Sequence, residues 1–179
     1  SFDSYTFEHS VNVCIISIII GIALDLNMLR LRDLGAGALL HDIGKLRIPE
    51  EILKKPFRLT VEEFEEVKKH TIYAYEILKS NKSFGNIASY IALEHHERCD
   101  GSGYPYQLKR NSIHLYSRIV AVADVFNALT SDRVYRKKMD KQNAFKYIIS
   151  LGNHHLDKEV TDVFVKYMDI YPIGIAGEN

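Results

Sequence analysis

The sequence predicts a single all-α domain. Long segments carry apolar residues at helical spacing, alternating strand patterns are scarce, and the prolines lie only at positions 49, 56, 105 and 172. At 179 residues the chain is long enough for one domain with a real core and short for two. We therefore expect one helical bundle of about seven helices that takes up the whole of residues 1–179.

Apolar periodicity places the helices along the chain, and capping residues mark several of their starts. Thr60 and Glu63 have the spacing of a capping box, and Asp140 and Asp157 are suited to cap the helices that follow them. The expected helices span residues 2–24, 29–43, 61–79, 84–98, 115–131, 141–151 and 158–168. The last ten residues, 170–179, begin a short strand or fray.

Composition excludes several classes of partner. The formal net charge is zero, which argues against binding to long nucleic acid. Cys14 and Cys99 form no disulfide framework, so we expect a reducing compartment, the cytoplasm. The apolar run 13–24 is shorter than the roughly 20 residues that span a bilayer, so we expect a buried helix and no membrane contact.

Polar residues interrupt two of the most apolar segments. Asp124 lies in a helix that is apolar on nearly every side, where a carboxylate needs a charged partner or a metal. A buried salt bridge with Arg118 and a functional role both remain open at this point. The segment DLGAGALLHDIGKL ends by bringing His41 and Asp42 toward the interior, just before Gly44 and Lys45.

Histidines lie on further apolar faces. His9 and His70, taken singly, are more typical of hydrogen-bonded core residues than of ligands. Together with the carboxylates, however, they form a sulfur-free set that suits iron, manganese or zinc in hydrolytic work. Two such ions roughly 3.5–4 Å apart would clamp a phosphoryl group for in-line attack. His95 and His96 diverge at a helix end, so they suit different ions or opposite sides of one cluster.

Three motifs occur in order: HDIGK at 41–45, HHERCDGSGYP at 95–105 and IVAVADVFNALTSDRVYR at 119–136. Together they resemble the HD-GYP family of the HD superfamily of metal-dependent phosphohydrolases. The resemblance runs from about His9 to the C-terminal YPIG. It implies an HD-type helical domain that holds two or three ions, usually iron or manganese. It also implies hydrolysis of cyclic di-GMP to pGpG, and sometimes onward to GMP, by a metal-bridging hydroxide.

The resemblance also implies roles for individual residues. Asp42 would bridge two metals, and Lys45 would face the scissile phosphate, so both are expected to be catalytic. Substrate contacts fall on Tyr104, Arg133 and Arg136. The implied metal ligands are His9, His41, Asp42, His70, His95, His96 and Asp124.

The chain departs from the family pattern at several positions. Many members with three metals carry a glutamate where this chain has Tyr5, so we expect two ions rather than three. Asn127 replaces an aspartate and removes a charge near Asp124. His114 replaces a common proline, Cys99 is expected to pack, and His154 and His155 are expected to lie on the surface or to cap a helix.

Two alternatives to a cyclic di-GMP phosphodiesterase remain open. One is a non-catalytic sensor of cyclic di-GMP, which the intact ligand set disfavours. The other is an HD phosphohydrolase of mononucleotides, which the Tyr104 loop and the arginine pair disfavour. The chain starts at Ser1, so we expect a fragment of a longer signalling protein with an upstream sensory or receiver domain. The oligomeric state is not predicted.

Overall fold

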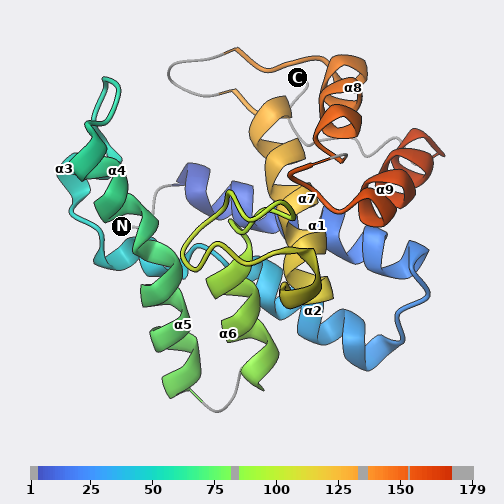
Figure 1. Cartoon of the computed structure of the whole chain (residues 1–179), viewed down its shortest axis with the longest axis horizontal. Helices are drawn as coiled ribbons and strands as arrows, with labels where there is room; N and C mark the ends of the chain where they lie inside the picture. Colours follow the sequence, from blue (N-terminus) through green and yellow to red (C-terminus); the bar gives the residue numbers. More distant parts are fainter. Residues whose placement is uncertain (1–3, 82–84, 133–136, 153, 171–179) are drawn as a thin grey trace.

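The structure, a computed structural model, describes residues 4–81, 85–132, 137–152 and 154–170. These residues form helices joined by turns and by a longer loop over residues 95–109, and their only β pairing is an isolated bridge between Asp100 and Lys109 (Figure 1). The prediction of an all-α domain is confirmed. A C-terminal strand would fall almost entirely outside the described residues.

Helices and two 3₁₀ turns make up the chain order of the described residues. In order they are α1 (Ser4–Ala23), α2 (Met28–Leu40), the 3₁₀ turn η1 (Ile43–Arg47), α3 (Glu50–Leu53), α4 (Val61–Lys68), α5 (His70–Ser80), α6 (Gly85–Glu94), the 3₁₀ turn η3 (Arg110–Ser112), α7 (Leu115–Thr130), α8 (Lys141–Leu151) and α9 (Lys158–Ile170).

Helix α7 runs through the middle of the molecule, with α5 and α6 on one side and α8 and α9 on the other (Figure 1). It is apolar on most of its surface because it packs against α1, α6, α8 and α9. Phe126 of α7 contacts Phe145 and Phe164, with ring centroids 5.4 and 4.9 Å apart respectively. This apolar cluster fixes the helix that carries Asp124.

Helix α1 is long and apolar. Among the described residues, Thr6–Ala23 is the one window that is long and apolar enough to cross a membrane by length and composition, with a mean hydropathy of 1.6. Core helices satisfy the same test. Val13 and Ile20 are fully buried, and α1 packs against α2, α7 and α9. This packing lets α1 carry His9 into the interior.

Two predicted helix ends are wrong, and one predicted helix is divided in two. Helix α2 stops at Leu40 rather than continuing to residue 43, because the chain tightens into η1, where the Lys45 amide donates to the Asp42 carbonyl. The predicted helix 61–79 is two helices that meet at Lys69, and α6 stops at Glu94 rather than residue 98. The short elements α3, η1 and η3 were not predicted.

The predicted caps are confirmed. Thr60 and Glu63 form a reciprocal capping box at the start of α4, and Asp140 caps α8 through the Asn143 amide. Asp157 accepts from the amides of Glu159 and Val160 at 2.9 and 3.2 Å, which satisfies free donors of the first turn of α9.

Candidate metal centre

Histidines and carboxylates from five parts of the fold meet at one point in the interior. His9 comes from α1, His41 and Asp42 follow α2, His70 begins α5, His95 and His96 follow α6, and Asp124 lies on α7. The structure thus brings together every described residue that the family resemblance implied as a ligand, namely His9, His41, Asp42, His70, His95, His96 and Asp124.

Asp42 lies at the centre of this cluster, and its two carboxylate oxygens face different histidines. Oδ1 lies 3.3 Å from His70 Nε2 and 3.9 Å from His95 Nε2. Oδ2 lies 3.4 Å from His41 Nε2 and 3.9 Å from His9 Nε2. A carboxylate placed in this way can bind one ion with each oxygen.

Main-chain carbonyl groups orient three of the histidines. The Nδ1 atoms of His41, His70 and His95 lie 2.7, 2.7 and 2.9 Å from the carbonyl oxygens of Ala38, Val67 and Ala92. Since a carbonyl oxygen only accepts, each Nδ1 carries the proton, and each Nε2 directs a lone pair at the cluster. The rings are therefore prepared as metal ligands.

The hydrogen bond of His70 also explains the break between α4 and α5. His70 Nδ1 donates to the Val67 carbonyl, and the Thr71 hydroxyl donates to the Lys68 carbonyl at 3.0 Å. These side chains bond carbonyl groups in the last turn of α4, and the Lys69 amide bonds at shorter spacing, to the Glu66 carbonyl. The tighter junction orients His70.

Close backbone packing holds η1 against α5. A Cβ atom on Gly44 would lie 1.9 Å from the His70 carbonyl oxygen and 2.5 Å from the Ala74 amide nitrogen. Both are main-chain atoms and cannot move aside without shifting a helix. Only glycine at position 44 allows Asp42 and His70 to lie this close.

Asp124 faces the histidine cluster and not Arg118. Asp124 Oδ1 lies 3.2 Å from His9 Nε2, and its Oδ2 lies 4.0 Å from His96 Nδ1. Arg118 instead pairs with Asp157, which also receives Arg110 Nε at 2.8 Å. A salt bridge between Asp124 and Arg118 is therefore absent, and Asp124 faces the histidine cluster.

The cluster fits divalent metal ions. Two ligands of one ion with bonds of about 2.0–2.2 Å lie roughly 3 to 4.4 Å apart, which matches the separations above. His41 Nε2 and Asp42 Oδ1 are buried polar atoms without a hydrogen-bond partner. Within the described part of the chain, two groups have ligand spacing: Asp42, His70, His95 and His96 form one, and His9, His41 and Asp42 form the other. Asp42 belongs to both.

The electrostatics favour neutral ligands and charged carboxylates in most positions. Burial lowers the pKa of His70 and of His95, and it lowers the pKa of His96 to about 3 against the effect of Asp124.

Burial acts to raise the pKa of Asp42, yet Lys45 and His41 hold it well below its usual range. Burial also acts to lower the pKa of His41, but Asp42 leaves it above its usual value. Neutral imidazole and ionised carboxylate are the forms that bind metals.

Lys45 lies at the solvent edge of the cluster. Its ammonium nitrogen is 2.6 Å from Asp42 Oδ2, and its side chain is 31% exposed whereas that of Asp42 is 3% exposed. The single turn of η1 brings the two residues together. Lys45 is therefore a positive group placed between the buried carboxylate and anything that approaches from solvent.

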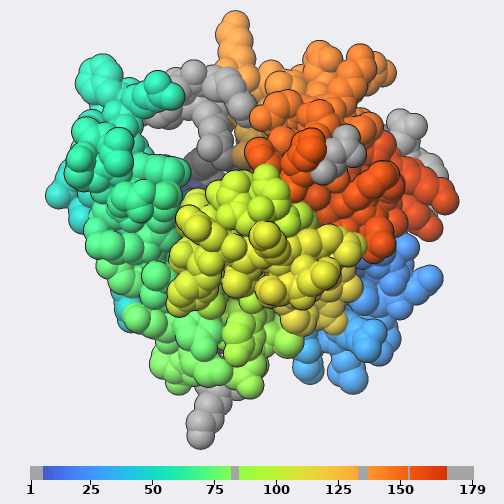
Figure 2. All heavy atoms as spheres, viewed as in Figure 1, coloured from blue at the N-terminus to red at the C-terminus, as the bar shows by residue number. Residues whose placement is uncertain are grey.

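A buried glutamate holds the loop after His96. Glu97 is 2% exposed, and its carboxylate accepts from the amides of Tyr106 at 2.7 Å and Leu108 at 2.9 Å. These bonds keep the loop near the end of α6 and account for the early end of that helix. In the space-filling view this loop, drawn in yellow, lies across the middle of the face shown (Figure 2).

The two loop glycines have different structural roles. Gly101 has a positive φ of 86°, as expected for this turn. Gly103 does not, and is required instead by close approach, since a Cβ there would lie 2.4 Å from the Arg98 amide nitrogen and 2.5 Å from Glu97 Cα. The next residue, Tyr104, consequently stacks on His96, with ring centroids 4.8 Å apart and an interplanar angle of 30°.

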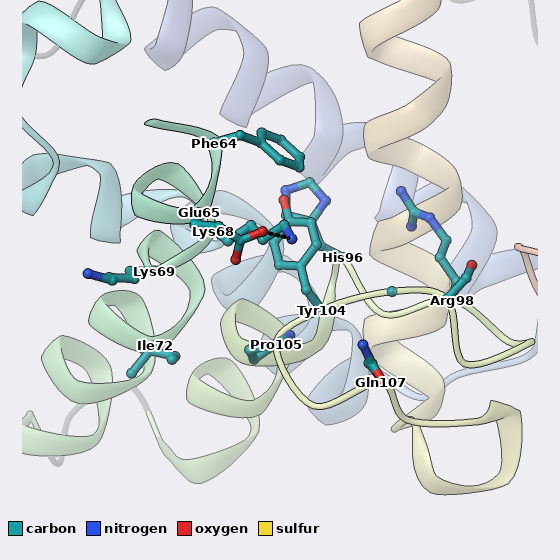
Figure 3. Close-up of a pocket in the computed structure, with 12 residues that line it drawn as sticks. Phe64, Glu65, Lys68, Lys69, Ile72, His96, Arg98, Tyr104, Pro105 and Gln107 are labelled. Carbon is teal, nitrogen blue, oxygen red and sulfur yellow. Dashed lines mark hydrogen bonds and ion pairs between the residues drawn. The ribbon is translucent and has the colours of Figure 1, made fainter. Parts of the chain in front are cut away.

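A pocket of about 570 Å³ opens beside Tyr104 (Figure 3). The Lys68 ammonium lies 5.6 Å from the centroid of the Tyr104 ring and 5.0 Å from that of Phe64. Phe64, Lys68 and Arg98 were not predicted as site residues: Phe64 and Lys68 lie outside the three motifs, and Arg98 lies within HHERCDGSGYP but was not singled out. The lining residues are Phe64, Glu65, Lys68, Lys69, Ile72, His96, Arg98, Ser102, Gly103, Tyr104, Pro105 and Gln107.

The remaining candidates lie apart from the centre or outside the described residues. Arg133, Arg136 and the side chain of Tyr5 fall outside them. His155 is surface-exposed and lies 3.5 Å from Asp100, and the half-buried Cys99 donates its amide to the His155 carbonyl. His114 Nδ1 accepts from the Tyr116 amide and so caps α7.

The fold and the cluster together define a helical domain with a buried histidine–aspartate centre. A sequence model described as "HD domain" matches residues 7–160, which is most of the chain. The chain therefore belongs to the HD domain family, as the sequence motifs predicted.

Two curated relatives show the extent of the similarity. The chain is 40% identical over 172 residues to a cyclic di-GMP phosphodiesterase of Pseudomonas aeruginosa, covering 96% of this chain and 41% of that protein. It is 40% identical over 177 residues to the 3'3'-cGAMP-specific phosphodiesterase 1 of Vibrio cholerae, covering 96% and 40%. The chain thus spans less than half the length of these relatives.

A solved structure shares the fold. It is that of Bd1817, described as a HDG"Y"P protein from Bdellovibrio bacteriovorus. The similarity has a TM-score of 0.75 at 21% identity and covers 92% of this chain and 52% of the other. This supports the all-α HD-type architecture.

Proposed function

We propose that this chain is a metal-dependent phosphodiesterase that hydrolyses cyclic di-GMP to pGpG. The observation that carries the proposal is the position of Asp42, whose two oxygens face separate histidine groups. Such a shared carboxylate suits a pair of ions rather than a single one. The relatives that are named phosphodiesterases of cyclic dinucleotides support the choice of substrate.

We assign two divalent ions, iron or manganese, to the residues that face one another in the centre. Histidine nitrogen and carboxylate oxygen without sulfur suit these metals. His70, His95, His96 and Asp42 would hold one ion, and His9, His41 and Asp42 the other, with Asp124 close to both groups. When bound, the ions would lower the pKa of water and stabilise the negative charge on the phosphoryl oxygens.

The residues of the chain then position the substrate for in-line displacement. Water attacks phosphorus, the bond from phosphorus to the ribose 3′ oxygen breaks, and that oxygen takes a proton, which leaves a 5′ phosphate on pGpG. Lys45, at the edge of the centre, donates to a phosphoryl oxygen and offsets its developing charge. Tyr104 lies beside His96 and gives a base a ring on which to pack.

The substrate contacts of two arginines, the cellular location and the control of the reaction stay predictions. Arg133 and Arg136 are proposed to contact the phosphates or guanine of the substrate. We also propose a cytoplasmic location, which the free, half-buried Cys14 and Cys99 support. A sensory or receiver domain elsewhere in the protein would control the reaction, and no contact of this domain with a membrane or long nucleic acid is proposed.

A product assay tests the function. Protein loaded with Mn²⁺ or Fe²⁺ is incubated with cyclic di-GMP, 3'3'-cGAMP and cyclic di-AMP, and the products are separated by chromatography. We expect pGpG from cyclic di-GMP and its loss after metal chelation, and the same chromatogram shows whether GMP follows. Tight binding of cyclic di-GMP by metal-loaded protein without any pGpG would show a sensor instead. Faster turnover of 3'3'-cGAMP would overturn the proposed substrate and keep the reaction class.

A further inference from the structure

Asn127 is a buried amide in the middle of the apolar helix α7. It is 1% exposed, and its Oδ1 lies 2.6 Å from Nδ1 of His9 on α1, a residue 118 positions away in the sequence. A buried amide costs stability unless it is hydrogen-bonded. The contact with His9 satisfies the amide oxygen and joins α7 to α1 at the candidate metal centre.

His9 differs from the other buried histidines in how its ring is held. His41, His70 and His95 lie at or just beyond helix ends and bond main-chain carbonyls three residues earlier. His9 lies inside α1 (Ser4–Ala23), where the carbonyl groups are engaged in helical hydrogen bonds. For His9 the acceptor at Nδ1 comes instead from another helix, as Asn127 Oδ1 of α7.

The bond fixes which nitrogen of His9 faces the centre. Asn127 Oδ1 is an acceptor, so His9 Nδ1 carries the proton and Nε2 presents its lone pair. That Nε2 lies 3.2 Å from Asp124 Oδ1 and 3.9 Å from Asp42 Oδ2. A cation between this lone pair and the two carboxylates would satisfy all three groups at once.

The geometry points to Asn127 as a positioning residue that fixes the tautomer of His9 and sets the strength of its metal bond. This inference rests on the proposed metal binding. An amide oxygen carries no net charge, so it polarises the imidazole less than a carboxylate does. The chain therefore holds the ion beside His9 less tightly than it would with an aspartate at position 127, and more tightly than with an apolar residue.

Three variants of α7 test the inference. Asn127→Leu removes the acceptor at similar volume, and Asn127→Asp replaces it with a charged one. Thr130→Val is the matched control, because Thr130 is also buried on α7 and bonds only the Phe126 carbonyl within its own helix. Mn²⁺ affinity is measured by competition with a chelator. The His9 nitrogen signals are recorded by ¹⁵N NMR in the Zn²⁺-loaded protein and assigned with a His9→Gln variant.

We expect Asn127→Leu to weaken Mn²⁺ binding about 10- to 100-fold and to shift the His9 Nδ1 signal. Asn127→Asp should strengthen Mn²⁺ binding, and Thr130→Val should change neither quantity. Wild-type affinity and an unchanged Nδ1 signal in Asn127→Leu would overturn the inference alone. Should that variant not fold, an unchanged affinity in Asn127→Asp would also overturn it. Failure of the wild type to take up either metal would overturn the proposed function as well.

Discussion

The Lys45 ammonium lies 2.6 Å from Asp42 Oδ2, so the one lysine of the HDIGK motif directly contacts its carboxylate. In this position it competes with a metal ion for Asp42 and is also available to a phosphate that approaches from solvent. Lys45→Met should lower kcat about 100-fold or more, because a donor to the developing phosphoryl charge is lost. Metal affinity should stay equal or rise.

Turnover at saturating substrate and chelator competition measure the two effects separately. Arg47→Met is the control, since Arg47 lies on the same 3₁₀ turn but pairs with the exposed Glu76. A large loss of metal in Lys45→Met would contradict the role proposed for this lysine.

Asp42→Ala should abolish hydrolysis and lower metal content, because both groups of ligands share this carboxylate. Elemental analysis and the pGpG assay check both effects. Asp33→Ala removes an exposed carboxylate on α2 that pairs with Arg32, and should leave both quantities unchanged. Full metal occupancy with normal turnover in Asp42→Ala would show the assignment of the centre to be wrong.

Tyr104→Ala should impair substrate binding and leave metal content unchanged, since the ring stacks on His96 but belongs to neither group of ligands. Loss of a stacking contact of about 1–3 kcal/mol corresponds to a KM roughly 5- to 150-fold higher. Tyr104→Phe separates the ring from its hydroxyl, and Tyr106→Ala, at a 60% exposed ring of the same loop, is the control. Metal loss with tight ligand binding retained would contradict this prediction.

The number of ions is predicted to be two, because neutral Tyr5 replaces a glutamate and a phenol with a pKa of about 10 is a weak ligand at neutral pH. Elemental analysis of protein purified without chelator, with anomalous diffraction at the metal edges, gives the count directly. Three well-occupied peaks per chain, with the Tyr5 oxygen at bonding distance to one of them, would refute the two-metal prediction.

The lowered pKa of Asp157 leads us to expect a pH dependence of stability that is separate from catalysis. Burial acts to raise its pKa, but hydrogen bonds from Arg118 and Arg110 hold that pKa below its usual value. Folding therefore favours the ionised form. The resulting stability is present above the unfolded pKa of about 3.9 and is lost as the pH falls through the lower folded pKa.

Asp157→Asn should consequently lower the free energy of unfolding by about 3 kcal/mol at pH 7, since it leaves a partly buried arginine without its partner. The difference from wild type should shrink as the pH falls below about 4. Urea denaturation at a series of pH values measures it. Asp162→Asn, which removes a pair with Lys158 at the surface, should cost less than about 1 kcal/mol.

Much of the fold could be predicted from the sequence because apolar periodicity marks helices whatever they pack against. The ends of the helices depended on distant groups. Helix α6 stops at Glu94 because Glu97 turns its carboxylate to the amides of Tyr106 and Leu108, a contact that no local pattern shows. The break at Lys69 depends on the bond from His70 to the Val67 carbonyl, which forms where η1 packs on α5.

For the candidate site, too, the sequence predicted the residues but not the contacts that orient them. The motifs singled out the histidines and aspartates, but they could not show which nitrogen of each ring faces inward. Asn127 was interpreted only as the loss of a charge, whereas the structure shows it bonded to His9 across the core. Its role comes from the packing of α1 on α7, and single-sequence patterns carry no information about such a contact.

The residues around the centre lie between His9 and Asp124 in the sequence, and each group spans helices that meet only in the folded chain. An unfolded chain has no such arrangement, so metal uptake and folding are linked equilibria. An ion at 100 times its dissociation constant would add about 2.7 kcal/mol to the stability of the whole domain. Metal supply would therefore govern how long the protein resists unfolding and proteolysis, so that a metal-starved cell would hold fewer copies of it as well as less active ones.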